Sequence, residues 1–332
     1  TGTFSKLPDK LLNIFKRYGI VTEKEVDVIL DASGFAYGEQ WGSRSLSHAS
    51  KEISRFRKEG KKYIFLPQAF GPFNQDKIKR LASQVFSQAD LVFARDESSY
   101  KAILNCHEKL TNCTHIFQSP DFTCLVEPTP YIEHTDTFEK QTEKKVCFIP
   151  NNKMVSSFHH KDASSEQAKY IDFFVQAGRF YHQQGWQVIL LNHEGIEDQQ
   201  LCQQIAQKLS NAKSIVIKDG LSAIDIKAYI GSVDAVISSR FHGCVSALTQ
   251  GIPCLATSWS HKYQMLFQEY GIGENVIDFK MAELELIELL TCFNQNLTKQ
   301  KQQCLKHANS VKQQSRHMWK QVFLQLEGIN ES

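Results

Sequence analysis

The chain has 332 residues, of which 42% are hydrophobic and 22% charged, enough for about two globular domains of ordinary size. Its 38 Lys and Arg side chains nearly balance 36 Asp and Glu, giving a formal charge of +2. This balance excludes the broad positive surface that phosphate-backbone binding requires, so we expect no nucleic-acid partner. The sequence contains neither a run of about 18 apolar residues nor the apolar core of an N-terminal secretory signal. We therefore expect a cytoplasmic protein with no transmembrane segment, whose contact with a membrane, if any, is peripheral.

The nine cysteines form no C-x-x-C pair and no cluster with histidine at zinc-site spacing. Three of them, Cys147, Cys244 and Cys254, lie in apolar stretches, where a thiol packs as a small hydrophobic side chain. We expect reduced, packed cysteines and no metal site.

Short runs rich in β-branched and other apolar residues recur along the chain. Because these runs are continuous rather than alternating, they predict parallel strands that are buried on both faces. The expected strands are 26–33, 62–68, 89–96, 146–150, 186–194, 214–219, 234–239 and 253–259.

Segments with helical periodicity lie between these runs, and the chain after about Gly273 is also helical in pattern. Strand–helix alternation predicts an α/β protein with doubly wound sheets. The expected helices between strands are 76–88, 98–107, 166–185, 198–209 and 223–231.

Between Glu127 and Lys145 the pattern lapses into a segment with two prolines, many charges and almost no aliphatic residue. This composition is typical of a linker. The sequence thus predicts an N-terminal domain (1–130), a linker (131–145), a C-terminal domain (146–275) and C-terminal helices (276–332).

Ligands of open parallel sheets bind beyond the carboxyl ends of the strands, so polar residues there are informative. Arg240 and His242 follow one expected strand and adjoin a helix start. A helix N-terminus and a guanidinium both favour an anion, and an imidazole can transfer a proton near neutral pH. A structural Arg–carboxylate pair and a turn-capping His would explain these residues equally well.

Other strand ends carry similar but less specific residues. The pair Arg95-Asp96 is expected to form a salt bridge and a helix N-cap. The remaining candidates, any of which could equally belong to an ordinary loop, are Asp31, Ser33, Gly34, Tyr37, Gln68, Asn152, Lys153, His193 and Glu194.

An ordered series of segments resembles the polysaccharide pyruvyl transferases. The segments are DASGF, AYGEQWG, PQAFGPF, ARDESSY, SPDF, LNHEGIED, SSRFHGCVSAL and GIPCLATSWSHKYQML, and they extend from about Val26 to Ile272. The resemblance implies two Rossmann-like domains that face a cleft, similar to GT-B glycosyltransferases. It also implies an enzyme that transfers pyruvate from phosphoenolpyruvate to a sugar of a polysaccharide or glycan precursor, forming a pyruvate ketal. Such a precursor can be linked to a lipid.

The chain departs from this family pattern at two places. Some family members have a basic residue after the first strand of the second domain, where this chain has Asn151, Asn152 and Lys153. Family chains also usually open with a strand and a Gly/Asn-containing loop, whereas only 25 residues precede Val26 here. We expect the first, acceptor-side domain to be abbreviated or truncated.

The Arg-x-His element of the family matches Arg240, Phe241 and His242, and the resemblance implies that this element binds the donor. The chemistry of the reaction suggests that His242 transfers a proton or contacts the phosphate and that Glu194 or Asp31 acts as base. Phosphoenolpyruvate is a substrate in this scheme, and no cofactor or metal is required. The donor-binding residues are then Arg240, Phe241, Gly243, Lys262, Asn152 and Lys153, and the acceptor-binding residues are Ser33, Gly34, Tyr37, Gln68 and His193.

Two alternatives stay open at this point. A nucleotide-sugar glycosyltransferase of the same architecture would use Arg240 and Lys262 to neutralise a diphosphate and Glu194 to contact a ribose. A non-catalytic glycan-binding protein would use Tyr37, Trp41 and Trp259 as stacking platforms.

Overall fold

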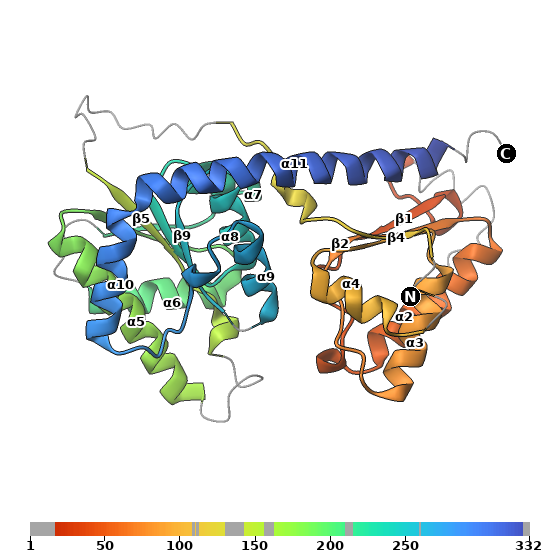
Figure 1. Cartoon of the computed structure of the whole chain (residues 1–332), viewed down its shortest axis with the longest axis horizontal. Helices are drawn as coiled ribbons and strands as arrows, with labels where there is room; N and C mark the ends of the chain where they lie inside the picture. The colour runs from red at the N-terminus through yellow and green to blue at the C-terminus, as the bar shows by residue number, and fades with distance from the viewer. Residues whose placement is uncertain are drawn as a thin grey trace. The chain divides into compact units, whose positions relative to one another are not determined.

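The computed structural model describes residues 17–107, 110, 113–129, 143–155, 163–209, 215–258 and 260–327 (Figure 1). The predicted linker lies outside the described residues except for 143–145, and Trp259 also lies outside them. Within the described part of the chain, no helix combines the length and the apolar character needed to cross a membrane.

The chain divides into two compact α/β units. Unit 1 consists of Thr1–Phe122 and Gln314–Ser332, and unit 2 of Thr123–Gln313. The boundary between the units lies between Phe122 and Thr123, before the predicted linker. The end of the chain belongs to the N-terminal unit rather than to a separate helical region. The reason is packing, because Met318 and Val322 near the end of the chain join a hydrophobic cluster of unit 1.

Within the described residues, unit 1 contains a parallel sheet of four strands in the order β1-β2-β3-β4. One face packs against three helices, through residues such as Phe65 on β2 and Phe86 on α3. The other face packs Ile64 and Phe93 against the end of α11. The elements are β1 (Val28–Asp31), α2 (Arg44–Lys58), β2 (Lys62–Gln68), α3 (Asp76–Gln88), β3 (Leu91–Ala94), α4 (Glu97–Leu104), β4 (Ile116–Gln118) and α11 (Leu297–Glu327).

Arg95 and Asp96 have the structural roles that the sequence predicted. Asp96 is the N-cap of α4, where its carboxylate accepts the N–H of Ser99 at 2.7 Å. Arg95 forms a buried ion pair with Asp121 at 3.1 Å. Both residues therefore stabilise the edge of the unit 1 sheet.

The described part of unit 2 forms a six-stranded parallel sheet with helices on both faces. The strand order is β10-β9-β8-β5-β6-β7. Strands β6 and β7 therefore lie on one side of β5, and β8, β9 and β10 lie on the other. This is the Rossmann strand order. The elements are β5 (Lys145–Ile149), α5 (Ala163–Gln183), β6 (Gln187–Leu191), α6 (Gly195–Lys208), β7 (Ile215–Lys218), α7 (Ala223–Ile230), β8 (Ala235–Ser238), α8 (Phe241–Leu248), β9 (Cys254–Thr257), α9 (His261–Glu269), β10 (Val276–Ile277) and α10 (Glu283–Gln295).

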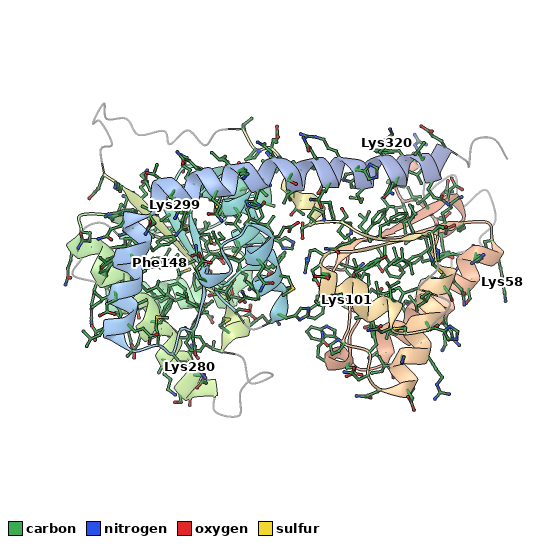
Figure 2. All side chains as sticks on the ribbon, viewed as in Figure 1. Lys58, Lys101, Phe148, Lys280, Lys299 and Lys320 are labelled. Atoms are coloured by element: carbon green, nitrogen blue, oxygen red, sulfur yellow. The ribbon has the colours of Figure 1, made fainter. Side chains whose placement is uncertain are left out.

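Alternate residues of the central strand β5 point to opposite layers of unit 2. Phe148 packs with α5, α6 and α10, and Cys147 and Ile149 pack with α7, α8, α9 and the start of α11. Phe148 is fully buried in this core, while the lysines labelled with it in Figure 2 are exposed. Burial on both faces explains why β5 has a continuous apolar sequence.

The cysteines follow the expectation from composition. All nine are free thiols, and Cys147, Cys244 and Cys254 are fully buried. Burial raises the pKa of Cys202 to about 12, which keeps this thiol protonated. Only Cys292 is classed as exposed among the nine.

All eight expected strands and all five expected helices are present, with ends that differ by a few residues. The elements α2, α9, β4 and β10 were not predicted from the sequence, and the region after Gly273 contains the short β10 before its helices. The prediction of an α/β protein with Rossmann-like units is confirmed.

Candidate functional site

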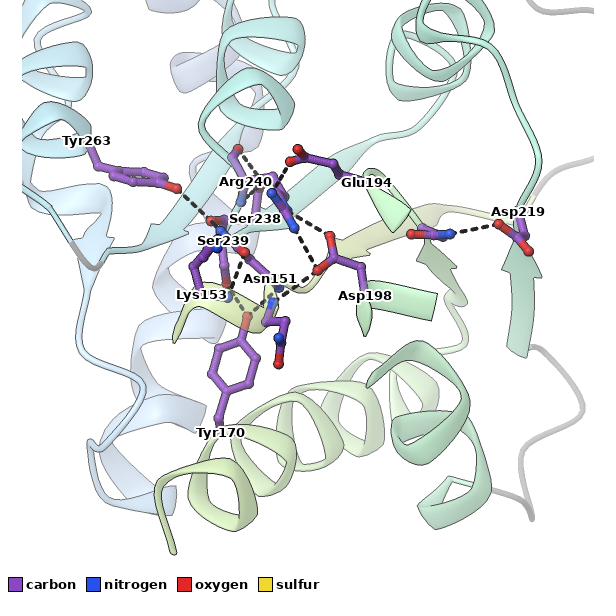
Figure 3. A network of polar contacts seen from close by, with 12 residues as sticks. Asn151, Lys153, Tyr170, Glu194, Asp198, Asp219, Ser238, Ser239, Arg240 and Tyr263 are labelled. Atoms are coloured by element: carbon purple, nitrogen blue, oxygen red, sulfur yellow. Dashed lines mark hydrogen bonds and ion pairs between the residues drawn. The ribbon is translucent and has the colours of Figure 1, made fainter. Parts of the chain in front are cut away.

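The strand order of unit 2 reverses between β5 and β8, where Rossmann sheets bind their ligands beyond the strand ends. Asn151 follows β5, and Ser239 and Arg240 follow β8. The side-chain N–H of Asn151 donates to the carbonyl of Ser239 at 2.9 Å, which joins the two loops (Figure 3). The Arg-x-His segment predicted to bind the donor thus lies at the switch point.

The guanidinium of Arg240 is held by two carboxylates from α6 and the loop before it (Figure 3). Its Nε and Nη2 donate to the two oxygens of Asp198, at 2.7 and 2.8 Å. Its Nη1 contacts the carboxylate of Glu194. The bidentate pair with Asp198 fixes the plane of the guanidinium, because a fork bound through two nitrogens cannot rotate freely.

Asp198 is fully buried, and one of its oxygens also accepts the backbone N–H of Asn152 at 3.0 Å. Burial acts to lower the pKa of Arg240, but the hydrogen bonds and negative charge of Asp198, together with the charge of Glu194, outweigh it and raise that pKa. Arg240 is therefore a permanent cation at this site.

A buried network of hydroxyl groups holds the loop after β8. The hydroxyl of Tyr170 donates to Ser239 Oγ at 2.6 Å, and the hydroxyl of Tyr263 donates to the Ser239 carbonyl at 2.6 Å. Ser239 Oγ also lies 2.6 Å from Thr257 Oγ1. Burial raises the pKa of Tyr170, so its hydroxyl remains a neutral donor. The network positions the backbone from which Arg240 projects.

His242 is exposed in the first turn of α8, directly after Arg240 and Phe241. The Phe241 ring is buried and packs edge-on against both His242 and Tyr263, with ring centroids 5.6 Å apart in each case. Lys262 places its ammonium 5.1 Å from the centroid of the Phe241 ring. Phe241 thus brings a cation and an imidazole to the same end of α8.

Gly243 has a packing reason to be glycine. A Cβ at this position would lie 2.7 Å from Ser238 Oγ and 3.0 Å from Ile149 Cδ1. A larger residue would therefore crowd Ser238 and Ile149 at the ends of β8 and β5. This observation explains the residue type, and the predicted contact of its backbone with a donor remains a prediction.

His193, at the end of β6, is half-buried near the same site. Desolvation lowers its pKa to about 4, and the nearby positive charges of His242 and Arg240 add to the effect. His193 is therefore neutral near pH 7.

Asn152 and Lys153 follow Asn151 in the short helix η6 (Asn152–Met154) after β5. Asn152 contacts Asp198 through its backbone, and the Lys153 N–H donates to Asn151 Oδ1 at 2.9 Å. The Lys153 side chain is exposed and forms no ion pair within the described residues. Both residues lie in the loop network around Arg240.

The predicted acceptor-side residues of unit 1 gather around Asp31, at the end of β1. Its carboxylate accepts hydrogen bonds from Ser33 Oγ at 2.6 Å, Tyr37 OH at 2.6 Å and Tyr63 OH at 2.8 Å. Gln68 Nε2 lies 3.3 Å from the same carboxylate. Burial raises the pKa of both tyrosines, so their hydroxyls stay protonated as donors. Four side chains thus fix the position of the Asp31 side chain.

Gly34 lies within this unit 1 cluster at a φ of +75°, which favours glycine. The Gly34 carbonyl accepts the N–H of Ala69 at 2.9 Å, linking the loops after β1 and β2. Gln68 is fully buried, and its Oε1 has no hydrogen-bond partner among the described residues. The structure gathers the predicted Ser33, Gly34, Tyr37 and Gln68 in one cluster, whereas His193 belongs to unit 2.

The residues that follow the strands were predicted from the sequence, whereas the residues that support Arg240 were not. Asp198 lies on the first turns of α6, and Tyr170 on α5 contributes its hydroxyl from a different element. Asp198 has one readable signal, a carboxylate four residues after Glu194 on an expected helix. Tyr170 has none, because aromatic residues in a helix usually indicate core packing.

A model of the polysaccharide pyruvyl transferase family matches residues 2–261. The match includes the loops that carry Asp31, Glu194 and Arg240. The chain belongs to this family. Its membership agrees with the ordered segments of the sequence and supports a transferase that acts in polysaccharide biosynthesis.

Several solved structures have a similar fold at low sequence identity. A putative UDP-N-acetylglucosamine 2-epimerase from Listeria monocytogenes has 10% identity and a TM-score of 0.59, covering 96% of this chain and 78% of the other. The trehalose-6-phosphate synthase OtsA has 10% identity and a TM-score of 0.53, covering 94% and 74%. Accessory secretory protein 1,2 and 3 of Streptococcus pneumoniae has 10% identity and a TM-score of 0.52, covering 97% and 57%. These likenesses show a fold of the GT-B type and no more.

Proposed function

We propose that the protein transfers pyruvate from phosphoenolpyruvate to a sugar of a polysaccharide or glycan precursor, in the cytoplasm, and forms a pyruvate ketal. The observation that carries the proposal is the position of Arg240-x-His242 at the Rossmann switch point, in a chain of the polysaccharide pyruvyl transferase family. A compact anion such as phosphoenolpyruvate suits a permanent cation beside a helix start.

The reaction needs anion binding and proton transfer. Protonation of the methylene carbon of phosphoenolpyruvate gives an oxocarbenium-like centre, which one sugar hydroxyl attacks. Phosphate then leaves, and a second hydroxyl closes the ring of the ketal. The two hydroxyl protons balance the proton that is added to carbon and the proton that leaves with phosphate, so each turnover gives one ketal and one phosphate.

We assign the donor to the unit 2 residues described above. Arg240 binds an anionic group of the donor, and the exposed ammonium of Lys153 and the half-buried one of Lys262 neutralise further charge. His242, the exposed imidazole beside Arg240, transfers a proton or contacts the phosphate. Asn152, Phe241 and Gly243 support this site through the contacts of their loops.

We assign the acceptor to the Asp31 cluster of unit 1; His193, which the sequence also placed with the acceptor, lies in unit 2 near Arg240 and His242. The Asp31 carboxylate already accepts hydrogen bonds from Ser33, Tyr37 and Tyr63. It therefore suits the placement of a hydroxylated ligand through those neighbours better than the removal of a proton, because its lone pairs are occupied. No cofactor enters the proposed reaction.

The test is a comparison of donors. Incubation with phosphoenolpyruvate and a panel of sugar acceptors should release inorganic phosphate and leave an acidic, acid-labile ketal on one acceptor. Release of a nucleoside diphosphate from a nucleotide sugar, without reaction of phosphoenolpyruvate, would replace the proposal with a glycosyltransferase. Glycan binding without turnover of either donor would indicate a binding protein.

A further inference from the structure

The two carboxylates that contact Arg240 differ sharply in exposure. The side chain of Asp198 is 0% exposed, whereas that of Glu194 is 70% exposed. Asp198 also accepts the N–H of Asn152, so it is fixed by three hydrogen bonds. Glu194 has no such support.

Glu194 is the N-cap residue of α6, but its side chain makes no capping hydrogen bond. Among the described residues, its carboxylate has Arg240 Nη1 as its polar partner. Asp198 binds Nε and Nη2 of Arg240, and the exposed Glu194 carboxylate binds the remaining nitrogen, Nη1. The Glu194 carboxylate can leave this ion pair at low cost, because it is exposed and water solvates its charge when the pair opens.

The Glu194 carboxylate opposes the binding of an anion at Arg240 Nη1, because it occupies that nitrogen and carries like charge. One guanidinium faces two carboxylates, and His193 adds no positive charge near pH 7 because its pKa is lowered to about 4. A donor that carries a carboxylate and a phosphate would meet like charge at this point. Withdrawal of the Glu194 carboxylate would both uncover Nη1 and remove that repulsion.

We propose that Glu194 is an exchangeable carboxylate that occupies the anion position on Nη1 of Arg240 until the donor displaces it. Asp198 remains in place and keeps the fork aimed, and the donor anion takes over the contact that Glu194 releases. The proposal rests on the proposed function only for the identity of the anion, and it replaces the role of base that the sequence suggested for Glu194.

Two roles for Glu194 predict opposite results on substitution. A competing carboxylate lowers donor affinity, so its neutralisation lowers the Kd and KM for the donor with kcat largely retained. A base removes a proton in the reaction, so its neutralisation lowers kcat with KM largely retained.

The experiment measures binding of phosphoenolpyruvate and of inorganic phosphate, separately, to the full chain by calorimetry. The variants are Glu194→Gln, which keeps an acceptor, and Glu194→Ala, which removes it. The matched control is Glu197→Gln, because Glu197 is also exposed in the first turn of α6 and forms no ion pair within the described residues. Steady-state kinetics with phosphoenolpyruvate follow.

We expect both Glu194 variants to bind at least one anion about three- to tenfold more tightly than the wild type, as expected for removal of one nearby like charge. Glu197→Gln should change the Kd by less than about twofold, because its carboxylate is exposed and makes no ion pair with Arg240 within the described residues. Equal shifts for Glu194→Gln and Glu197→Gln, or weaker binding by either Glu194 variant, would overturn the proposal.

The phosphate measurement separates this proposal from the proposed function. Tighter phosphate binding by Glu194→Gln, with no binding or turnover of phosphoenolpyruvate, would support the exchangeable carboxylate and contradict the pyruvyl donor. If the wild type and both Glu194 variants bind neither anion, the exchangeable carboxylate is wrong.

Discussion

The two carboxylates that contact Arg240 at the switch point have different roles. The Arg240 guanidinium has one deeply buried partner, Asp198, and one exposed partner, Glu194. A buried carboxylate is costly to keep without its cation, whereas an exposed one is solvated by water. The stability of this site should therefore depend on Asp198, and its affinity for an anion on Glu194.

Asp198→Asn should lower the free energy of unfolding by about 2–4 kcal/mol, because it leaves the half-buried Arg240 without its bidentate partner. Chemical denaturation of purified variants measures this loss. Asp172→Asn is the matched control, since Asp172 pairs with Lys208 on the surface and should contribute less than about 1 kcal/mol. Equal effects of the two substitutions would show that burial of Asp198 is not what makes the pair important.

His193 should make the protein less stable as the pH falls from about 6.5 to 4. Its folded pKa is lowered to about 4 by desolvation and by the charges of His242 and Arg240, so over this range the unfolded chain binds a proton that the folded chain does not. The loss attributable to this residue reaches at most about 3 kcal/mol. His193→Gln should therefore show a shallower fall in melting temperature with pH. Parallel curves for the two proteins would contradict the lowered pKa.

His242→Gln should alter the pH dependence of turnover if His242 transfers the proton. The imidazole is exposed in the first turn of α8, where it can reach a ligand beside Arg240. We expect one limb of the pH–rate profile of kcat to disappear and kcat to fall by about two orders of magnitude. His182→Gln, at an exposed histidine near the end of α5, is the control and should leave the profile unchanged. An unchanged profile for His242→Gln would leave His242 with a structural role.

At the scale of elements, a long segment with a repeating pattern could be predicted from the sequence, whereas a segment of two or three residues could not. The strand β2 was expected at 62–68 and is present with these bounds, because a long apolar run is typical of a strand buried on both faces. The three residues of β4 and the two of β10 are too short to show any period. The helix α2 does have a helical pattern in its sequence, because Leu46, Ala49, Ile53 and Phe56 recur at helical spacing and are all buried. This helix could have been predicted from that pattern but was not.

The end of α11 should stabilise unit 1 through its buried face. Met318 and Val322 pack against one face of the unit 1 sheet, whereas Leu324 on the same helix is 59% exposed. Met318→Ala should cost about 2–4 kcal/mol by removing buried side-chain volume, and Leu324→Ala less than about 0.5 kcal/mol. Chemical denaturation would measure the free energy of unfolding of both variants, and hydrogen exchange would report the protection of β2 and β3. Similar protection in the two variants would contradict this packing.

At the scale of the whole molecule, donor binding should protect one unit more than the other. The proposed donor site lies in unit 2, around the loops after β5 and β8. A ligand that binds only the folded state slows local opening where it binds. Hydrogen exchange with saturating phosphoenolpyruvate should therefore slow in peptides that contain 149–153 and 238–244. Protection confined to the Asp31 cluster of unit 1 would place the donor there instead.

The sequence by itself determined the fold class, most strands and helices, and the position of the Arg-x-His segment at a strand end. These features depend on local periodicity and on residues that are adjacent in the chain. Only the tertiary structure decided that the end of α11 belongs to unit 1 and that Arg240 is shared by a buried and an exposed carboxylate. The partners in these contacts are tens of residues apart, as Asp198 and Arg240 are separated by 42 positions, and local patterns carry no information on such pairings.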